Sequence, residues 1–384
     1  MQATANSKST GSSTDETPTP PIEDISVHGT GDVIGWLNKV KASLAFSSYQ
    51  PGKLFLIGRD AAGNLSVFHR NFDLCMGVTL DEKQNLYVAS LYQIWKLTNI
   101  LPKGQLYQDF DRLYCPQVSY ITGEVNTHDI ALDYASRLIF VNTSFNCLSI
   151  ISTDHSFDVL WKPSFISQLV AEDRCHLNGM AMENGRPRYV TMFAATNEIE
   201  GWRSHRVNGG IIIDVNTQEI VCSGLSMPHS PRIYRNRLYV LNSGAGEFGY
   251  VNKKTGRFKA ITFCPGFTRG LSFIGDYAIV GLSKLKAPAI EDNLPIIQNL
   301  KKHGFEESLC GFCIIDLRTG KIDCSLEFSS SAMNFIYDVI PIENALKPLT
   351  LGIEQDHIRR AISLPPSTDK EHGELVILEN IRQM

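Results

Sequence analysis

Hydrophobic and polar residues alternate in short runs along most of the chain, and the same arrangement recurs six times. Each copy starts at a small or polar residue, continues through an alternating run, turns at Asp, Asn or Gly, and ends in a second β-rich run. Alternation with a period of two predicts a β-strand, and two such runs joined by a turn predict a hairpin. The six predicted hairpins begin at Cys75, Thr127, Leu177, His229, Thr268 and Ile336.

More strand-like runs lie between the hairpins, so that each repeat contains about four strands. The repeats begin 39 to 68 residues apart, and the widest gap holds the insertion 284–308, in which we expect a helix. Four strands repeated at this interval are typical of a β-propeller blade. Strands within 43–72 precede the first repeat, and we expect them to complete the sixth blade with the strands after residue 336. A β-sandwich is the competing architecture, but it does not explain six similar hairpins.

The sequence therefore predicts an all-β fold, a six-bladed β-propeller that occupies residues 25–384 as a single domain. A short helix is expected within 32–44, and the glycine-rich stretch 29–35 is interpreted as a linker turn because no strand-like run precedes it. Residues 1–24 are rich in Ser, Thr and Pro and contain almost no large apolar residue. Such a segment cannot bury enough apolar surface to fold, so a disordered N-terminal tail is predicted.

Composition and charge narrow the class of protein. Hydrophobic residues make up 43% of the chain and charged residues 20%, which is typical of a soluble globular protein. The formal net charge of -4 gives no basic field that would attract nucleic acid or an anionic membrane. No apolar run reaches the ~18–20 residues of a membrane helix. We therefore expect neither nucleic acid nor a membrane as a partner, and the oligomeric state is left open.

The chain has nine cysteines, an odd number that suits reduced thiols better than a disulfide framework. The N-terminus lacks the apolar core of a secretory signal. Both observations favour an intracellular, cytoplasmic protein. Cys310 and Cys313 have the CxxC spacing of zinc and redox sites, but no second pair follows at zinc spacing. We interpret these two residues as ordinary buried thiols.

The first residues of the hairpins include the ionisable and polar side chains that could bind a ligand or catalyse a reaction. In a propeller, the innermost strand of each blade begins at the central channel, so the heads meet at one mouth although they are far apart in sequence. The residues predicted to meet there are His128, Asp129, His176, Asn178, His229, Arg269, Tyr337 and Asp338. A converging group of ionisable side chains is the usual candidate for a binding or catalytic site.

Histidine titrates near neutral pH and acts as an acid, a base or a metal ligand. We therefore predict a catalytic set in which His128 and His229 act as base and acid. Asp129 would orient His128, and Arg269 would stabilise developing negative charge. The residues predicted to contact the ligand are His176, Asn178, Arg232, Trp202 and Tyr337.

The same mouth is a candidate site for a divalent metal ion, because imidazole, carboxylate and amide groups are its common donors. The predicted metal ligands are His128, Asp129, His176, Asn178 and His229. The loop 193–204, which carries Trp202, is expected to cap the mouth with an aromatic face. In the alternative interpretation, the polar heads only satisfy the strand ends, and each histidine hydrogen-bonds a neighbouring blade. The sequence contains no distances that would decide between these roles.

Several long stretches resemble a family of conserved hypothetical proteins with a domain of unknown function, found in bacteria and sometimes beside tetratricopeptide repeats. The matching stretches follow one another over roughly residues 70–340 and include "ITGEVNTHDIAL", "AEDRCHLNGMAM", "LSMPHSPRIY" and "PGFTRGLSFIG". They carry most of the polar heads, namely His128 and Asp129, His176 with Asn178, His229 with Arg232, and Arg269. The resemblance implies a propeller but no established reaction.

More loosely, the fold is similar to the six-bladed lactonase and gluconolactonase propellers, which hold a divalent metal at this mouth with Asn, Asp and Glu. This analogy implies metal-binding roles for Asn178 and Asp129 and makes hydrolysis a candidate reaction. Two functions therefore stay open, and the sequence does not establish whether the protein is an enzyme. The first is binding or transformation of a small polar or acidic ligand, or of a peptide segment, at the mouth. The second is a non-catalytic scaffold that presents one face to protein partners.

Overall fold

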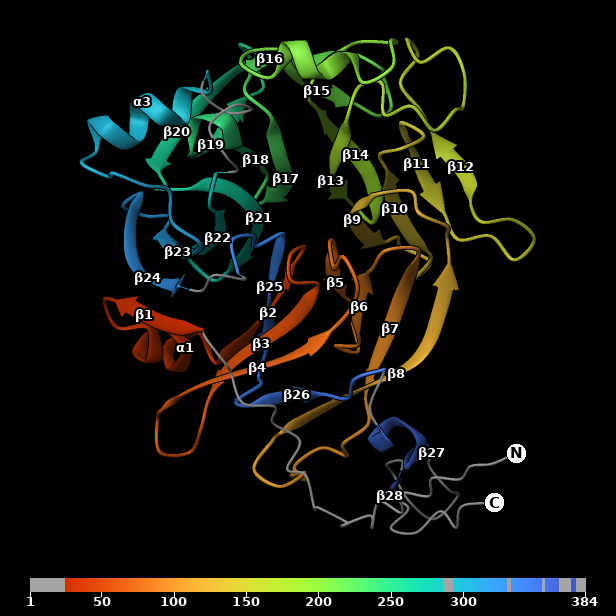
Figure 1. Cartoon of the computed structure of the whole chain (residues 1–384), viewed down its shortest axis with the longest axis vertical. Helices are drawn as coiled ribbons and strands as arrows, with labels where there is room; N and C mark the ends of the chain where they lie inside the picture. Colours follow the sequence, from red (N-terminus) through yellow and green to blue (C-terminus); the bar gives the residue numbers. More distant parts are fainter. Residues whose placement is uncertain (1–24, 286–292, 330–332, 354–355, 366–373, 378–384) are drawn as a thin grey trace, which may run out of the picture.

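The computed structural model describes residues 25–285, 293–329, 333–353, 356–365 and 374–377. The predicted disordered tail, residues 1–24, lies outside the described residues. In the described chain, six sheets of four or five strands are arranged in a ring with their inner strands toward its axis (Figure 1). The chain is therefore an all-β, six-bladed propeller, as predicted. No helix among the described residues is both long enough and apolar enough to cross a membrane.

The first three blades follow one another along the chain, each with its innermost strand first. Blade 1 contains β5 (Val78–Leu80), β6 (Leu86–Ala89), β7 (Gln93–Asn99) and β8 (Arg112–Ile121). Blade 2 contains β9 (Thr127–Leu132), β10 (Leu138–Asn142), β11 (Cys147–Ile150) and β12 (Asp158–Trp161). Blade 3 contains β13 (Leu177–Glu183), β14 (Arg186–Met192), β15 (Gly210–Asp214) and β16 (Ile220–Leu225).

The other three blades complete the ring. Blade 4 contains β17 (Pro228–Tyr234), β18 (Arg237–Asn242), β19 (Glu247–Asn252) and β20 (Arg257–Phe263). Blade 5 contains β21 (Phe267–Ile274), β22 (Tyr277–Ser283), β23 (Gly311–Asp316) and β24 (Lys321–Ser329). Blade 6 contains β25 (Asp338–Glu343), β2 (Ala42–Ser48), β3 (Lys53–Arg59) and β4 (Leu65–Asn71).

The ring closes in blade 6, where segments from both ends of the chain pair. β25 runs antiparallel to β2, with Asp338 opposite Ser47. This is the closure that the sequence predicts. Two flanking strands extend neighbouring blades: β1 (Ser26–Thr30) pairs with β24 at the edge of blade 5, and β26 (Pro348–Thr350) runs parallel to β8 at the edge of blade 1.

One local prediction near the N-terminus is wrong, and the other is confirmed. The stretch 29–35 is not a linker turn, because it contains the end of β1 and the start of α1 (Val33–Val40). Asp32 caps this helix by accepting a hydrogen bond from the backbone N–H of Gly35 at 2.7 Å. The helix lies within 32–44, as predicted, and it ends at Val40 because Lys41 adopts a left-handed φ of 51° and the following alternating run forms β2.

Short elements occupy some of the connections between strands. The helix expected in the insertion 284–308 is present as α3 (Pro295–Lys302). The remaining elements are the single-turn helices η1 (Gly201–His205), η2 (Ser243–Ala245) and η3 (Asp356–Arg359) and the hairpin of β27 (Ala361–Leu364) and β28 (Glu374–Ile377).

Apolar side chains fill the space between neighbouring blades. Phe46 of blade 6 stacks on Phe55 with ring centroids 4.5 Å apart, and it meets the edge of Phe312 of blade 5 at 4.9 Å. All three rings are fully buried. The nine cysteines are also buried free thiols. Cys310 and Cys313 therefore belong to the core, as predicted.

Glycine allows the inner strands to approach one another around the channel. Gly270 in β21 has a φ of +71°, and a Cβ at this position would lie 2.7 Å from the Cα of Asp338 in the next blade. A side chain there would collide with backbone atoms. The same arrangement recurs in two other pairs of blades, in which Gly77 faces Asp129 and Gly179 faces Pro231. Glycine and a larger residue thus alternate around the ring.

Candidate functional site

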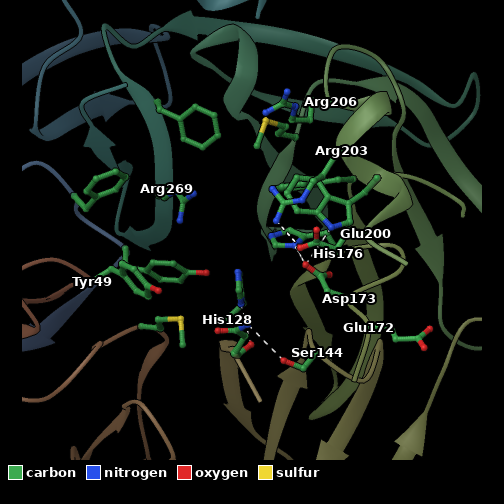
Figure 2. A pocket seen from close by; sticks show the side chains of 18 of the residues that line it. Tyr49, His128, Ser144, Glu172, Asp173, His176, Glu200, Arg203, Arg206 and Arg269 are labelled. Atoms are coloured by element: carbon green, nitrogen blue, oxygen red, sulfur yellow. Dashed lines mark hydrogen bonds and ion pairs between the residues drawn. The ribbon is translucent and has the colours of Figure 1, made fainter. Parts of the chain in front are cut away.

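A cavity of ≈ 660 Å³ opens where the inner strands begin (Figure 2). Each of the six blades contributes a residue from the head of its inner strand, namely Met76, His128, His176, Met227, Phe267 and Tyr337. The fold thus brings the hairpin heads together, as the repeat predicts. The loop after β14 forms one wall through Ile199, Glu200, Trp202, Arg203 and Arg206. We call this space the mouth cavity.

His128 lies near the start of β9 and lines the mouth cavity. Its Nδ1–H donates to the carbonyl oxygen of Asn126 at 2.8 Å. Nδ1 also lies 3.0 Å from the hydroxyl of Thr143, which itself donates to a backbone carbonyl. These acceptors hold the proton on Nδ1 and leave a lone pair on Nε2. Burial, with His176 and Arg269 nearby, holds the pKa of His128 well below its ordinary value, so the ring is neutral at pH 7.

His176 precedes β13, and its ring meets that of His128 edge to face with centroids 5.0 Å apart. Its Nδ1–H donates to Oδ2 of Asp173 at 2.7 Å. The same carboxylate oxygen accepts a hydrogen bond from the indole N–H of Trp202 at 3.1 Å. The His176 ring also packs against Phe193 at 4.2 Å and against Trp202 at 4.4 Å. The carboxylate and the two rings therefore hold the imidazole in one orientation on the cavity wall.

The rings of His128 and His176 are held in the same tautomer. In each ring an oxygen holds Nδ1, and no group in the described part of the chain hydrogen-bonds Nε2. A general base needs an available lone pair and a partner that fixes its tautomer. His176 has the stronger partner, because the Asp173 carboxylate stabilises the imidazolium that proton uptake would form.

His229, at the head of β17, repeats the surroundings of its counterpart in blade 2. Its Nδ1–H donates to the carbonyl oxygen of Met227 at 2.8 Å, and Nδ1 lies 2.9 Å from the hydroxyl of Ser243. The residue is only 3% exposed, and its ring packs against Phe193 and Phe267 with centroids 5.3 and 5.5 Å away. Burial holds the pKa of His229 well below its ordinary value. His229 is therefore a buried residue behind the lining of the mouth cavity.

Asp129 belongs to an ion cluster between the inner strands. Its Oδ2 accepts hydrogen bonds from Arg232 at 2.7 Å and from the backbone N–H of Met180 at 2.9 Å, and its Oδ1 accepts a second bond from Arg232 at 3.1 Å. Arg232 also lies 3.9 Å from Asp338. Asp338 in turn accepts a hydrogen bond from the backbone N–H of Val78 at 3.1 Å. We call Asp129, Arg232 and Asp338 the channel ion cluster; its contacts join five of the six blades.

The channel ion cluster changes two roles that were predicted from the sequence. The carboxylate of Asp129 does not orient His128, because it binds Arg232 and a backbone N–H. Arg232 pairs with the carboxylates of Asp129 and Asp338. Neither Asp129 nor Arg232 belongs to the lining of the mouth cavity. Burial, with Asp129 as a nearby like charge, raises the pKa of Asp338 to about 7 against the opposing effect of Arg232. Charges buried in this way require partners, which makes the cluster a structural element.

The remaining predicted residues divide between the cavity lining and the surrounding core. Arg269, Tyr337 and Trp202 line the mouth cavity. The Arg269 guanidinium lies over the rings of Phe267 and Tyr337, 5.2 and 5.1 Å from their centroids. Asn178 is outside the lining and 3% exposed, and its Nδ2 has no hydrogen-bond partner among the described residues.

The predicted metal ligands are not gathered at one point. Within the described ranges, no group of three or more His, Cys, Asp and Glu side chains is placed to hold a metal ion. His128 and His176 line the cavity, Asp129 binds Arg232, and His229 is buried behind aromatic rings. A catalytic zinc site needs about three protein ligands. A divalent metal ion stays a prediction that these donors do not support.

Positive charge is in excess on the cavity wall. The lining carboxylates all have partners, with Glu200 bound to Arg203 at 2.5 Å, Glu172 to Arg174 at 2.7 Å and Asp173 to His176 at 2.7 Å. Arg206 and Lys284 also line the cavity, and neither forms an ion pair with another described residue. The wall therefore has cationic groups available for a bound molecule.

Several residues around the cavity have left-handed backbone conformations. The angle φ is +53° at Asn126, +41° at Asp173, +50° at His176, +46° at Glu200 and +46° at Met227. Such a conformation costs roughly 1–2 kcal/mol for a residue with a side chain. Strained backbone held in place by its surroundings is typical of functional sites. Here it places two carbonyl oxygens and one carboxylate against imidazole rings.

The sequence pattern did not indicate three residues of this site. Asp173 lies three residues before His176, but their contact depends on a left-handed turn that no hydrophobic pattern reveals. Arg206 lies at the end of the wall-forming loop, and Lys284 directly follows β22. Inspecting the ends of the second strands, and not only the heads of the hairpins, would have found Lys284.

The chain matches a family model that is described as "Domain of unknown function (DUF4915)" over residues 31–351. This range holds almost the whole propeller, and it confirms the expected resemblance to a family with a domain of unknown function. No curated protein matches the chain.

The solved structures that are similar to the chain include the following three. One, titled a crystal structure of a nidogen/laminin complex, is 11% identical, with 79% of this chain and 99% of that chain covered and a TM-score of 0.49. Virginiamycin B lyase from Staphylococcus aureus is 10% identical, with 80% and 99% covered and a TM-score of 0.36. A streptogramin B lyase is 11% identical, with 69% and 97% covered and a TM-score of 0.37. The function has to be argued from the cavity itself.

Proposed function

Because the chain belongs to the DUF4915 family, whose description assigns no reaction, we propose a function from its geometry: the mouth cavity is the active site of an enzyme that uses a general base on a small polar molecule. One observation carries this proposal. His176, oriented by Asp173 at 2.7 Å, lies on the wall of a cavity of ≈ 660 Å³ with its Nε2 unbound by any described residue. Cavities of roughly 300–1,000 Å³ accommodate small organic molecules.

In this proposal His176 removes a proton from water or from the bound molecule. For hydrolysis of an ester or lactone, Nε2 takes a proton from water while the water oxygen bonds to the carbonyl carbon. The carbonyl oxygen gains negative charge, which the excess positive charge of the cavity wall would stabilise. When the bond to the leaving oxygen breaks, the imidazolium returns its proton to that oxygen. Asp173 lowers the free energy of the imidazolium throughout, because it is a carboxylate hydrogen-bonded to Nδ1.

His128 has a different part in the proposed site. Its depressed pKa keeps the ring neutral, so that it does not repel the positive charge that forms on His176. Its Nε2 lone pair accepts a hydrogen bond from the attacking water or from a hydroxyl of the bound molecule. The two histidines therefore differ in role: His176 exchanges a proton, and His128 positions a donor.

A panel of aryl esters and lactones tests the proposal with wild type, His176→Gln, Asp173→Asn and His205→Gln. His205 is the matched control, because it is exposed on the wall-forming loop but does not line the cavity. Loss of the base should lower kcat/KM about 100-fold or more, and loss of its orienting acid should lower it less. The control should stay within about twofold of wild type, because it contacts neither the base nor the cavity.

Two results would count against this proposal. Equal rates for wild type and His176→Gln on every hydrolysed substrate would remove His176 from the reaction. A cavity that binds small molecules and turns none of them over would leave a small-molecule-binding protein without the proposed reaction.

A further inference from the structure

We infer that the molecule bound in the mouth cavity is a planar aromatic compound that carries a carboxylate or phosphate group, an inference that rests on the proposed function of this cavity. The inference depends on three observations: the charges on the wall, the aromatic rings beside them, and the position of the base. The first two concern residues outside the His176–Asp173 pair.

Three separate segments supply cations to the cavity. Arg206 comes from the loop after β14, Arg269 from β21 and Lys284 from the residue after β22. Each lining carboxylate is already bound by a cation or an imidazole. The cavity is therefore most favourable for a ligand that supplies negative charge. The planar guanidinium groups suit the paired oxygens of a carboxylate or phosphate.

Aromatic rings adjoin Arg269 on its wall of the cavity. Tyr49, Phe267, Phe335 and Tyr337 all line the cavity, and the Arg269 guanidinium covers two of these rings at 5.2 and 5.1 Å. A ligand ring stacked on Phe267 or Tyr337 would therefore bring an attached anionic group to Arg269. Stacking of this kind contributes binding energy beyond the area that is buried. One molecule with both a ring and an anion fits the wall better than either group alone.

Tyr337 adds a directional contact. It is 6% exposed, and its hydroxyl has no hydrogen-bond partner among the described residues. Burial raises the pKa of this phenol, so the hydroxyl keeps its proton and acts as a donor. A buried donor without a partner costs free energy, which an oxygen atom of the ligand would recover.

The base lies across the cavity from this wall. Figure 2 shows Arg269 on one side and His176 with Asp173 on the other, with His128 between them at the floor. An aromatic anion held by Arg269 would therefore direct its opposite end toward Nε2 of His176. This places the reacting bond away from the anionic group of the ligand.

Four probes test the ligand class by calorimetry and by the fluorescence change of Trp202, one of four tryptophans in the chain. The probes are benzoate, phenyl phosphate, the neutral isostere benzamide and the non-aromatic anion cyclohexanecarboxylate. We expect benzoate or phenyl phosphate to bind at least about tenfold more tightly than benzamide, because one charge-assisted hydrogen bond lowers a dissociation constant by about this factor. Cyclohexanecarboxylate should bind more weakly than benzoate. The preferred anion shows whether the site is built for a carboxylate or for a phosphate.

Charge-neutral variants locate the anion. Arg269→Gln and Lys284→Gln should each weaken binding of the preferred anion about tenfold and leave benzamide unchanged. The matched controls are Arg257→Gln and Lys254→Gln, which remove the same charges from exposed positions outside the cavity. Thermal melting of each variant shows whether the fold is intact.

The outcomes separate the ligand class from the reaction. Equal binding of benzoate, phenyl phosphate and benzamide, or unchanged binding in both cavity variants, would overturn the ligand class and leave the role of His176 standing. Tight, charge-dependent binding together with no effect of His176→Gln on turnover would support the ligand class and overturn the proposed reaction.

Discussion

Blades 2 and 4 hold a histidine at the head of the inner strand in the same way but use it differently. In both blades a residue with positive φ lies two positions before the histidine, and its carbonyl oxygen accepts the Nδ1–H at 2.8 Å. A hydroxyl from the end of the adjacent strand supports the same nitrogen. The matching residues are Asn126, His128 and Thr143 in blade 2 and Met227, His229 and Ser243 in blade 4.

The difference lies in what covers each ring. Phe193 and Phe267 pack on His229, whereas His128 opens on the mouth cavity. The repeat therefore builds the support, and the residues contributed by neighbouring blades decide whether the ring is accessible. The two heads are also joined, because Asp129 beside His128 binds Arg232 of blade 4. A site residue and a structural residue are thus neighbours in the same strand.

The largest effect on the free energy of unfolding is expected at Arg232, which links blade 4 to Asp129 of blade 2. Arg232→Met would leave Asp129 and Asp338 buried without their cation, which should cost about 3–5 kcal/mol of unfolding free energy. Arg235→Gln is the control: its 2.6 Å pair with Asp276 is exposed to solvent, so this variant should stay close to wild type in stability. Urea unfolding at pH 7 measures both. Similar losses in the two variants would show that the channel ion cluster is not a structural tie.

Replacing each histidine with alanine distinguishes a structural role from a role in binding or catalysis. His229→Ala should lower the unfolding free energy by about 2–3 kcal/mol, because it empties buried space and leaves a buried acceptor without its donor. His128→Ala should cost about 1 kcal/mol or less, because the ring faces the cavity, but it should impair ligand binding or turnover. Urea unfolding and the binding assay are measured on the same samples. The reverse pattern would exchange the roles assigned to the two blades.

The pH dependence of stability should reveal the buried ring. The folded pKa of His229 is depressed below the unfolded value of about 6.5, so its contribution is complete above that pH and is lost as the pH falls. The loss amounts to at most about 1.4 kcal/mol per pH unit. His229→Asn should therefore show a shallower fall in unfolding free energy between pH 6.5 and 5. Parallel curves for wild type and the variant would contradict a buried neutral histidine.

Asp338 acts in the opposite direction over an overlapping range. Its folded pKa is raised to about 7, so its contribution is complete below the unfolded value of about 4 and is lost as the pH rises toward 7. Asp338→Asn should remove this component, and its unfolding free energy relative to wild type should increase with pH. Urea unfolding at pH 5 and pH 8 measures the change. A difference that is constant across these pH values would show that the carboxyl is not the titrating group.

The comparison of the two blades also shows how far the sequence leads. The repeat predicts the hairpins, the ring closure and the meeting of the heads, because alternation and turns are local properties. When the repeats are aligned by the first residue of each alternating run, however, His229 takes the position that Thr127 has in blade 2. The strand pairing instead matches Thr127 with Pro228, since each lies opposite the last residue of the adjacent strand. Both inner strands shift register by one residue against their partners, so this match holds along the whole strand, and the alignment by alternation is one residue out of step with the pairing.

Contacts between blades could not be predicted in the same way. Asp129 meets Arg232 across 103 residues, and neither residue type reveals which partner it will find. His128 lines the mouth cavity, where the sequence predicts it to lie. Asp129 was predicted to orient it because the two residues are adjacent in the chain. In a strand, adjacent side chains point to opposite sides. His128 and Asp129 accordingly have separate surroundings. The carboxylate that orients an imidazole in the site is that of Asp173, and the imidazole it binds is that of His176, not His128.

The smallest expected effects concern the two hydroxyls behind the rings. Ser243→Ala and Thr143→Val each remove one hydrogen bond to Nδ1 and should cost about 1 kcal/mol in urea unfolding. Their consequences for the rings should differ. His229 is enclosed by aromatic rings and keeps its Met227 carbonyl partner, so its tautomer should persist, whereas the more accessible His128 should show a mixed population by ¹⁵N NMR. If the two variants have equal stability but only Thr143→Val weakens ligand binding, then a support shared by two blades serves the cavity in blade 2 alone. If both rings keep their tautomers and binding is unchanged, the carbonyl oxygens are sufficient and the hydroxyls serve only to satisfy the strand ends.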